Sequence, residues 1–299
     1  MSMNVKPVPT LDNEINEIRL ATAEIINQQI LPLEGKLWGW LSDSANAPNE
    51  VVAEGKALRR QVQEKVKEAG LWAPHLPREF GGMGLSFLQH AYMNEILAYS
   101  PGAASLFGVV APNSGNQKIL VKYGTPEQHE KWLQPLTDGT MQSGFSMTEP
   151  DNPCSDPRSI TTRAELDGDE WVINGHKWFT SNGYAADFYI VMCRTADPDD
   201  PGGANDKMTQ IIVPKDTPGV NIVRGVPVWG RSSSHCEIVY DNVRVPKENQ
   251  LGRTGTGHQA AQDRLGAGCC VNGTPITHGA FDAYRSRPLS NVCYDGTPS

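Results

Sequence analysis

Phe145-Ser-Met-Thr-Glu-Pro150 follows closely on the point, near Met141, where the hydrophobic period of the chain changes from helical to alternating. A second stretch of similar character, Trp178-Phe-Thr-Ser-Asn-Gly183, comes later in the alternating region. Together they predict two β-strands that present backbone amides, small hydroxyls and an aromatic ring. Such a surface suits a flat heteroaromatic ligand, although an ordinary strand with a threonine turned into the core would explain the first stretch taken alone.

The residues before Met141 predict helices. Apolar residues recur at helical spacing before Pro32 and again before Gly70, and a loop rich in proline and glycine follows at 74–86. Three further helices are expected, one begun by Ser86, one ending near Gly124, and one begun by Thr125-Pro-Glu-Gln128 with a capping box and ending near Pro135. We therefore predict an all-α N-terminal domain over residues 1–140.

The residues after Met141 predict a sheet. A hairpin turns at Asp167-Gly-Asp169, and Asn174-Gly175 predicts another tight turn. Many short strands without intervening helices are typical of a closed or sandwiched antiparallel sheet. We predict an antiparallel β-barrel over residues 141–250 and a truncated C-terminal helical segment over 251–299. Further strands are expected at 188–194, 208–213, 220–228 and 236–245.

Composition narrows the functional class. The 299 residues carry 26 basic and 34 acidic side chains, a formal charge of −8, and no basic run interleaved with aromatic residues, which argues against nucleic acid as a partner. No run of 18 apolar residues and no signal or transit peptide is evident, so we expect a cytoplasmic protein without a membrane span. The six cysteines form no C-x-x-C pair, so we expect reduced thiols and no metal site.

Five motifs resemble those of acyl-CoA dehydrogenases in order and spacing, and the match covers about residues 10 to 268. They are Leu-Pro-x-x-Phe-Gly-Gly-x-Gly-Leu-Ser at 76–86, Tyr-Gly-Thr-Pro-Glu-Gln at 123–128, the two stretches quoted above, and Tyr240-Asp-Asn-Val-Arg-Val-Pro246. The resemblance implies an FAD cofactor, an acyl-CoA substrate, electron-transferring flavoprotein as acceptor, and a homo-oligomer. It implies these flavin contacts: Phe145, Ser146, Met147, Thr148, Phe179, Thr180 and Ser181.

The resemblance also implies how the substrate is handled. The family removes the α-proton of the thioester with a carboxylate while the β-hydrogen leaves as hydride, which yields the 2,3-enoyl-CoA. Most members supply a glutamate from a later helical domain, but a minority place the carboxylate just before an arginine, where this chain has Asp263 and Arg264. Asp263 is thus the candidate base and Arg264 a candidate substrate contact, unless both are solvated residues near a helix start. Ser155 matches a serine that contacts flavin or pantetheine.

The last residues depart from the family. After Gly268 the resemblance stops, and residues 269–299 lack helical periodicity, so we hypothesise a shifted reading frame or a truncated product. Three functions therefore compete at this point. They are an active dehydrogenase, a catalytically impaired remnant that still binds flavin or CoA, and a related flavin oxidase that passes electrons to oxygen.

Overall fold

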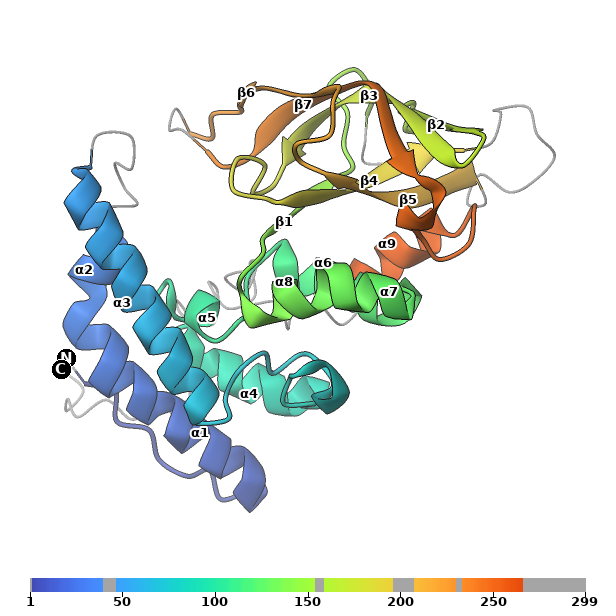
Figure 1. The fold of residues 1–299 in the computed structure, drawn as a ribbon. Helices are drawn as coiled ribbons and strands as arrows, with labels where there is room; N and C mark the ends of the chain where they lie inside the picture. Colours follow the sequence, from blue (N-terminus) through green and yellow to red (C-terminus); the bar gives the residue numbers. More distant parts are fainter. Residues whose placement is uncertain (1, 40–46, 154–158, 196–206, 230–232, 266–299) are drawn as a thin grey trace. The chain divides into compact units, whose positions relative to one another are not determined.

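The computed structural model describes residues 2–39, 47–153, 159–195, 207–229 and 233–265 (Figure 1). Ser155 and residues 269–299, both discussed above, lie outside the described residues. The described residues divide into two compact units, 2–110 and 111–265, and each is described by itself. The helical residues 111–140, which come just before the sheet, belong to the same unit as the sheet. The domain limits at 140 and 250 stay a prediction.

The first unit is helical, as predicted. Ser86 begins a helix with a capping box that Gln89 completes. Pro32 lies in a short 3-10 segment where the first helix changes pitch. Gly70, which follows another helix, has a φ of 70°. The core gathers buried side chains such as Ile26, Val66 and Met93. The helical elements are α1 (Asn13–Ile25), η1 (Ile26–Ile30), η2 (Leu31–Leu33), α2 (Glu34–Trp38), α3 (Asn49–Glu68), η4 (Arg78–Phe80), α4 (Phe87–Leu97) and α5 (Ala103–Leu106).

The second unit places its helices against one another and against the sheet (Figure 1). Thr125 begins the second of them with the predicted capping box to Gln128. That helical stretch runs past Pro135 to Asp138, three residues beyond the predicted end, and Gly139 ends it with a φ of 78°. The helical elements are α6 (Asn113–Tyr123), α7 (Pro126–Gln128), η5 (His129–Leu133), α8 (Gln134–Asp138), η8 (Lys247–Asn249) and α9 (Gly257–Leu265).

The sheet of the second unit is mixed, which corrects the prediction of an antiparallel barrel. The strands follow the order β6-β7-β3-β2-β4-β5-β8, with β1 paired to β4 outside this path. The pairs β1–β4 and β2–β4 are parallel, and among the described residues no pairing joins β6 to β8 to close a ring. The strands are β1 (Ser143–Ser146), β2 (Arg163–Asp167), β3 (Glu170–Thr180), β4 (Phe188–Arg194), β5 (Met208–Pro214), β6 (Val220–Gly225), β7 (Cys236–Pro246) and β8 (Gln250–Leu251).

The hairpin of β2 and β3 turns where the sequence predicted, at Gly168. The tight turn predicted at Asn174-Gly175 is wrong, because β3 continues through these residues to Thr180 with a register shift against β7. The glycine is needed for another reason: a Cβ on Gly175 would lie 2.3 Å from the Thr162 hydroxyl oxygen. A long, bulged strand therefore replaces two short ones, and it carries Lys177 and Phe179 toward the site.

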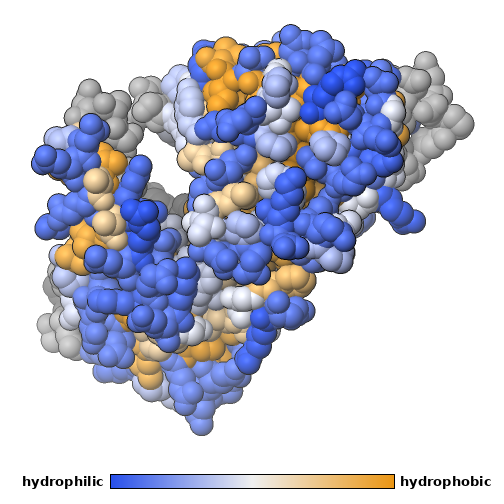
Figure 2. All heavy atoms as spheres, in the orientation of Figure 1, coloured by the Kyte–Doolittle hydropathy of each residue, from blue (hydrophilic) through white to orange (hydrophobic). Residues whose placement is uncertain are grey.

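Polar side chains cover most of the visible surface, with apolar patches between them (Figure 2). Scattered apolar exposure is normal, and one such side chain, Phe179, lines the site described below. Within the described residues no helix is long and apolar enough to cross a membrane. In the same part of the chain no group of three or more His, Cys, Asp or Glu side chains is placed to hold a metal ion.

Candidate functional site

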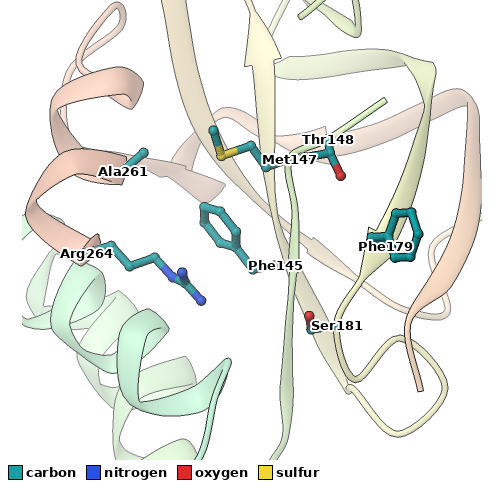
Figure 3. A pocket seen from close by; sticks show the side chains of 7 residues that line it. All are labelled: Phe145, Met147, Thr148, Phe179, Ser181, Ala261 and Arg264. Carbon is teal, nitrogen blue, oxygen red and sulfur yellow. The ribbon is translucent and has the colours of Figure 1, made fainter. Parts of the chain in front are cut away.

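A groove of about 220 Å³ lies between the first strand and α9 (Figure 3). Five of its lining residues come from the two stretches that the sequence singled out, and two come from α9. The lining is Phe145, Met147, Thr148, Phe179, Ser181, Ala261 and Arg264. The fold thus brings most of the predicted site residues to one surface.

The two stretches lie side by side. The Trp178 backbone N–H donates to the carbonyl oxygen of Thr148 at 3.0 Å, and the Thr148 hydroxyl donates to the Trp178 carbonyl oxygen at 2.8 Å. A further antiparallel bridge joins Phe145 to Ser181. Segments predicted separately from sequence therefore form one continuous wall of the groove.

Ser146 and Thr180 turn away from that wall. Both are fully buried, and their hydroxyl oxygens lie 2.9 Å apart, with the Tyr240 hydroxyl donating to Ser146 at 3.0 Å. Side chains alternate along a strand, so the neighbours of groove-lining residues must face the interior. Of the predicted contacts, these two can offer a ligand only their backbone.

Phe179 reaches the groove through an irregularity of β3. The register of β3 against β7 shifts between Lys177 and Thr180, and Phe179 takes a φ of 51°, a region that non-glycine residues rarely occupy. The residue is 42% exposed, and its ring meets the Trp178 ring edge-on with ring centres 5.0 Å apart. The bulge turns an aromatic side chain outward where strict alternation would not place one.

Arg264 directs its guanidinium into the groove (Figure 3). The guanidinium carbon lies 4.1 Å from the centre of the Phe145 ring, which is cation–π geometry. Its Nε donates to the side-chain oxygen of Asn116 on α6 at 3.3 Å, and Asn116 in turn donates to the Gly144 carbonyl oxygen. Gly115 leaves room for it, since a Cβ there would lie 2.8 Å from the arginine Nε.

Asp263 points elsewhere. Its carboxylate accepts hydrogen bonds from Lys122 at 2.6 Å and from the Tyr123 hydroxyl, both near the end of α6, and it does not line the groove. The hydrogen bond from Lys122 leads the contacts that hold the pKa of Asp263 below its ordinary value. A base that removes an α-proton at neutral pH needs a raised pKa, so this geometry argues against the role predicted for Asp263.

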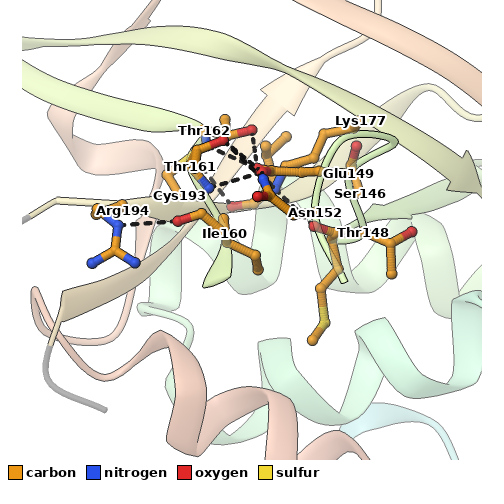
Figure 4. A network of polar contacts seen from close by, with 12 residues as sticks. Ser146, Thr148, Glu149, Asn152, Ile160, Thr161, Thr162, Lys177, Cys193 and Arg194 are labelled. Atoms are coloured by element: carbon orange, nitrogen blue, oxygen red, sulfur yellow. Dashed lines mark hydrogen bonds and ion pairs between the residues drawn. The ribbon is translucent and has the colours of Figure 1, made fainter. Parts of the chain in front are cut away.

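A buried ion pair supports the strand wall from behind (Figure 4). Lys177, fully buried on β3, donates to the Glu149 carboxylate at 3.0 Å and to the Met147 carbonyl oxygen at 2.8 Å. The backbone amides and hydroxyls of Thr161 and Thr162 also donate to Glu149, as does Asn152. One lysine thereby ties both groove-forming stretches together.

The Glu149 carboxylate is charged at neutral pH. Burial by itself raises the pKa of Glu149, but the positive charge of Lys177 and the hydrogen bonds from Thr162 and Thr161 outweigh it and lower the pKa to about 2. Because both carboxylate oxygens have several donors, the desolvated charge is compensated. The site therefore rests on a saturated ionic network rather than on apolar packing alone.

Sequence reasoning missed this support and also the role of Asn116. The signal for the pair was available, because Glu149 directly follows Thr148 and Lys177 stands at an inward position of an alternating strand. A charged residue at an inward position implies a buried partner. For Asn116 we find no local sequence signal, since its role depends on how α6 packs against β1.

Comparisons with known proteins agree with this fold. The family model described as acyl-CoA dehydrogenase, N-terminal domain, matches residues 41–140, and the one described as acyl-CoA dehydrogenase, middle domain, matches residues 144–243. A helical region followed by a mixed sheet is consistent with the fold of this class. The chain belongs to the acyl-CoA dehydrogenase family.

Three relatives show how similar this chain is to known members of the family. Probable acyl-CoA dehydrogenase FadE2 of Mycobacterium tuberculosis is 45% identical over 215 residues, which are 70% of this chain and 51% of that protein. The structure of a putative acyl-CoA dehydrogenase from Mycobacterium abscessus has a TM-score of 0.77 at 33% identity, over 87% of this chain and 65% of that one. A glutaryl-CoA dehydrogenase from Mycobacterium smegmatis, solved in complex with FADH2, has a TM-score of 0.64 at 27% identity, over 86% of this chain and 60% of that one. The chain spans about half the length of the first of these relatives.

Proposed function

We propose that the groove binds the isoalloxazine ring of FAD. The observation that carries the proposal is the joining of 145–148 to 178–181, which sets aromatic, thioether and hydroxyl groups along one wall. The likeness to the glutaryl-CoA dehydrogenase solved in complex with FADH2 supports it.

The lining residues fit such a ring. Phe145 and Met147 offer apolar contact to its faces, and the hydroxyls of Thr148 and Ser181 can hydrogen-bond its polar edge. The Thr148 hydroxyl already donates to Trp178, so toward the groove it acts as an acceptor. Phe179, which stands where the family usually has tryptophan, adds an exposed ring that limits access of water.

For the whole protein we propose oxidation of an acyl-CoA thioester to its 2,3-enoyl-CoA, with electrons passed to electron-transferring flavoprotein. Bound FAD would supply the hydride acceptor of this reaction. Arg264 would hold a polar group of the substrate or cofactor, because its guanidinium faces the groove over Phe145.

A second candidate is flavin binding without turnover. It is favoured by the position of Asp263, whose carboxylate is held by Lys122 and Tyr123 rather than facing the groove. A residue in this state would not take a proton from a thioester lodged there.

One experiment separates these functions. Purified protein is titrated with FAD, and the complex is then mixed anaerobically with acyl-CoA thioesters of different chain lengths. Yellow protein that bleaches supports the dehydrogenase, and yellow protein that does not bleach supports binding alone. Release of hydrogen peroxide in air identifies an oxidase, and failure to retain FAD rejects the proposal.

A further inference from the structure

Ser181, a lining residue of the groove, has a histidine directly behind it. Its hydroxyl oxygen lies 3.0 Å from Nδ1 of His235, the residue immediately before β7. The histidine ring also packs at a tilt against Phe179, with ring centres 6.3 Å apart. His235 thus touches two residues that line the groove.

The backbone of His235 is fixed. Its N–H donates to the Ser233 hydroxyl oxygen at 3.1 Å, and its carbonyl oxygen accepts the Val226 N–H at 2.7 Å. These bonds hold the backbone from which the imidazole projects, and the contacts with Ser181 and Phe179 hold the ring itself.

A serine hydroxyl holds one proton and two lone pairs, and it rotates unless a neighbour fixes it. When Nδ1 of His235 carries a proton, it donates to Ser181 and leaves the serine proton free to point into the groove. When Nδ1 is bare, Ser181 donates to it and presents a lone pair to the groove. The tautomer of His235 therefore decides whether Ser181 offers a donor or an acceptor.

We infer that His235 is a positioning residue that orients the Ser181 hydroxyl toward a flavin in the groove. The inference rests on the proposed function and adds to it a residue outside the groove wall. Because the pair can present either polarity, it suits a ring whose polar edge changes between acceptor and donor on reduction.

The test measures FAD affinity of the full chain in four forms: wild type, Ser181→Ala, His235→Ala and the double variant. Each single change is expected to weaken binding by about 3- to 10-fold, the range of one hydrogen bond. The double variant is expected to bind no more weakly than Ser181→Ala alone, because His235 acts through Ser181. Both single changes should alter the ratio of affinities for oxidised and reduced FAD in the same direction.

Two further variants separate positioning from folding. His235→Asn, whose amide can still donate to or accept from Ser181, is expected to recover most of the affinity. His176→Asn is the matched control, because His176 lies on β3 but bonds Glu237 at 2.9 Å rather than a groove residue, and it should leave FAD binding unchanged.

Three results would count against the inference in different ways. Losses from Ser181→Ala and His235→Ala that multiply in the double variant would overturn it while leaving flavin binding intact. An unchanged affinity in His235→Ala would do the same. A wild-type protein that binds no FAD would overturn the proposed function and this inference together.

Discussion

The two walls of the groove are built differently. The strand wall, formed by Phe145, Met147, Thr148, Phe179 and Ser181, is backed by a fully buried ion pair. The helix wall, formed by Ala261 and Arg264 on α9, is held beside Asp263, whose partner Lys122 has a side chain that is 60% exposed. One wall is backed by a desolvated ion pair, whereas the ion pair beside the other wall is exposed to water.

The two ion pairs are expected to respond differently when one partner is substituted. A buried charge that loses its partner cannot be solvated, so the strand wall is expected to fail sharply. An exposed pair contributes little, because water and salt already screen it. We therefore expect changes to the buried pair to cost more than changes to the exposed pair.

The sharpest way to break the strand wall is Lys177→Met. This change leaves the Glu149 carboxylate buried without its cation, and we expect the free energy of unfolding to fall by about 3–5 kcal/mol. Urea denaturation followed by circular dichroism measures the loss. A fall below about 1 kcal/mol would mean that the pair does not support the wall.

Two controls accompany this change. Lys177→Met combined with Glu149→Gln removes both charges and should recover at least half of the lost stability. Arg244→Met removes an exposed cation that bonds Asp167 and Glu170 on the same sheet, and we expect a cost under about 1 kcal/mol.

The dependence of stability on pH tests the contribution of the buried ion pair. The Glu149 pKa of about 2 in the folded protein lies below its ordinary value of 4.5, so its contribution is complete above pH 4.5 and is lost as the pH falls toward 2. The contribution amounts to about 3 kcal/mol. Stability measured from pH 6 to pH 2 should fall more steeply in wild type than in the Lys177→Met, Glu149→Gln double variant. Parallel curves would contradict the lowered pKa.

The strand wall could be predicted from the sequence more completely than the helix wall. The strand wall was predictable because 145–148 and 178–181 are local patterns, and alternation correctly implies that not every residue in them can face the groove. The parallel pairing of β1 with β4 was not predictable, since its register joins segments far apart in the chain. Asn174-Gly175 misled because glycine serves a bulge and a tight turn equally well.

The helix wall was harder to predict. Asp263 and Arg264 are adjacent, and neighbours on a helix point in different directions; here Arg264 lines the groove and Asp263 does not. Which one does depends on Gly115 and Asn116 of α6, whose packing against α9 has no local signature. The roles of Asp263 and Arg264 stay predictions that the resemblance implies.

A smaller effect is expected from Gly115→Ala. The new Cβ would lie 2.8 Å from the Arg264 Nε, so the flexible guanidinium must move off the Phe145 ring. Alanine favours the helix by about 1 kcal/mol, which offsets part of the cost and keeps the change in unfolding free energy within about 1 kcal/mol. A crystal structure of the variant would show the displacement. In an Arg264→Ala background the same change should simply stabilise, and an undisturbed guanidinium in the first variant would contradict the packing described.

The smallest effect is expected from Asp263→Asn. Its side chain is 26% exposed and that of Lys122 is 60% exposed, so loss of this pair should cost less than about 1 kcal/mol. Because the carboxylate faces α6, FAD affinity should stay within about twofold of wild type, which is within the effect of one hydrogen bond. Isothermal titration with FAD and urea denaturation measure both. If instead the wild-type flavin bleaches with an acyl-CoA and the Asp263→Asn flavin does not, the carboxylate must swing from Lys122 into the groove during the reaction. The helix wall would then be the moving part of the site, and the exposed Lys122–Asp263 pair would be the contact that breaks.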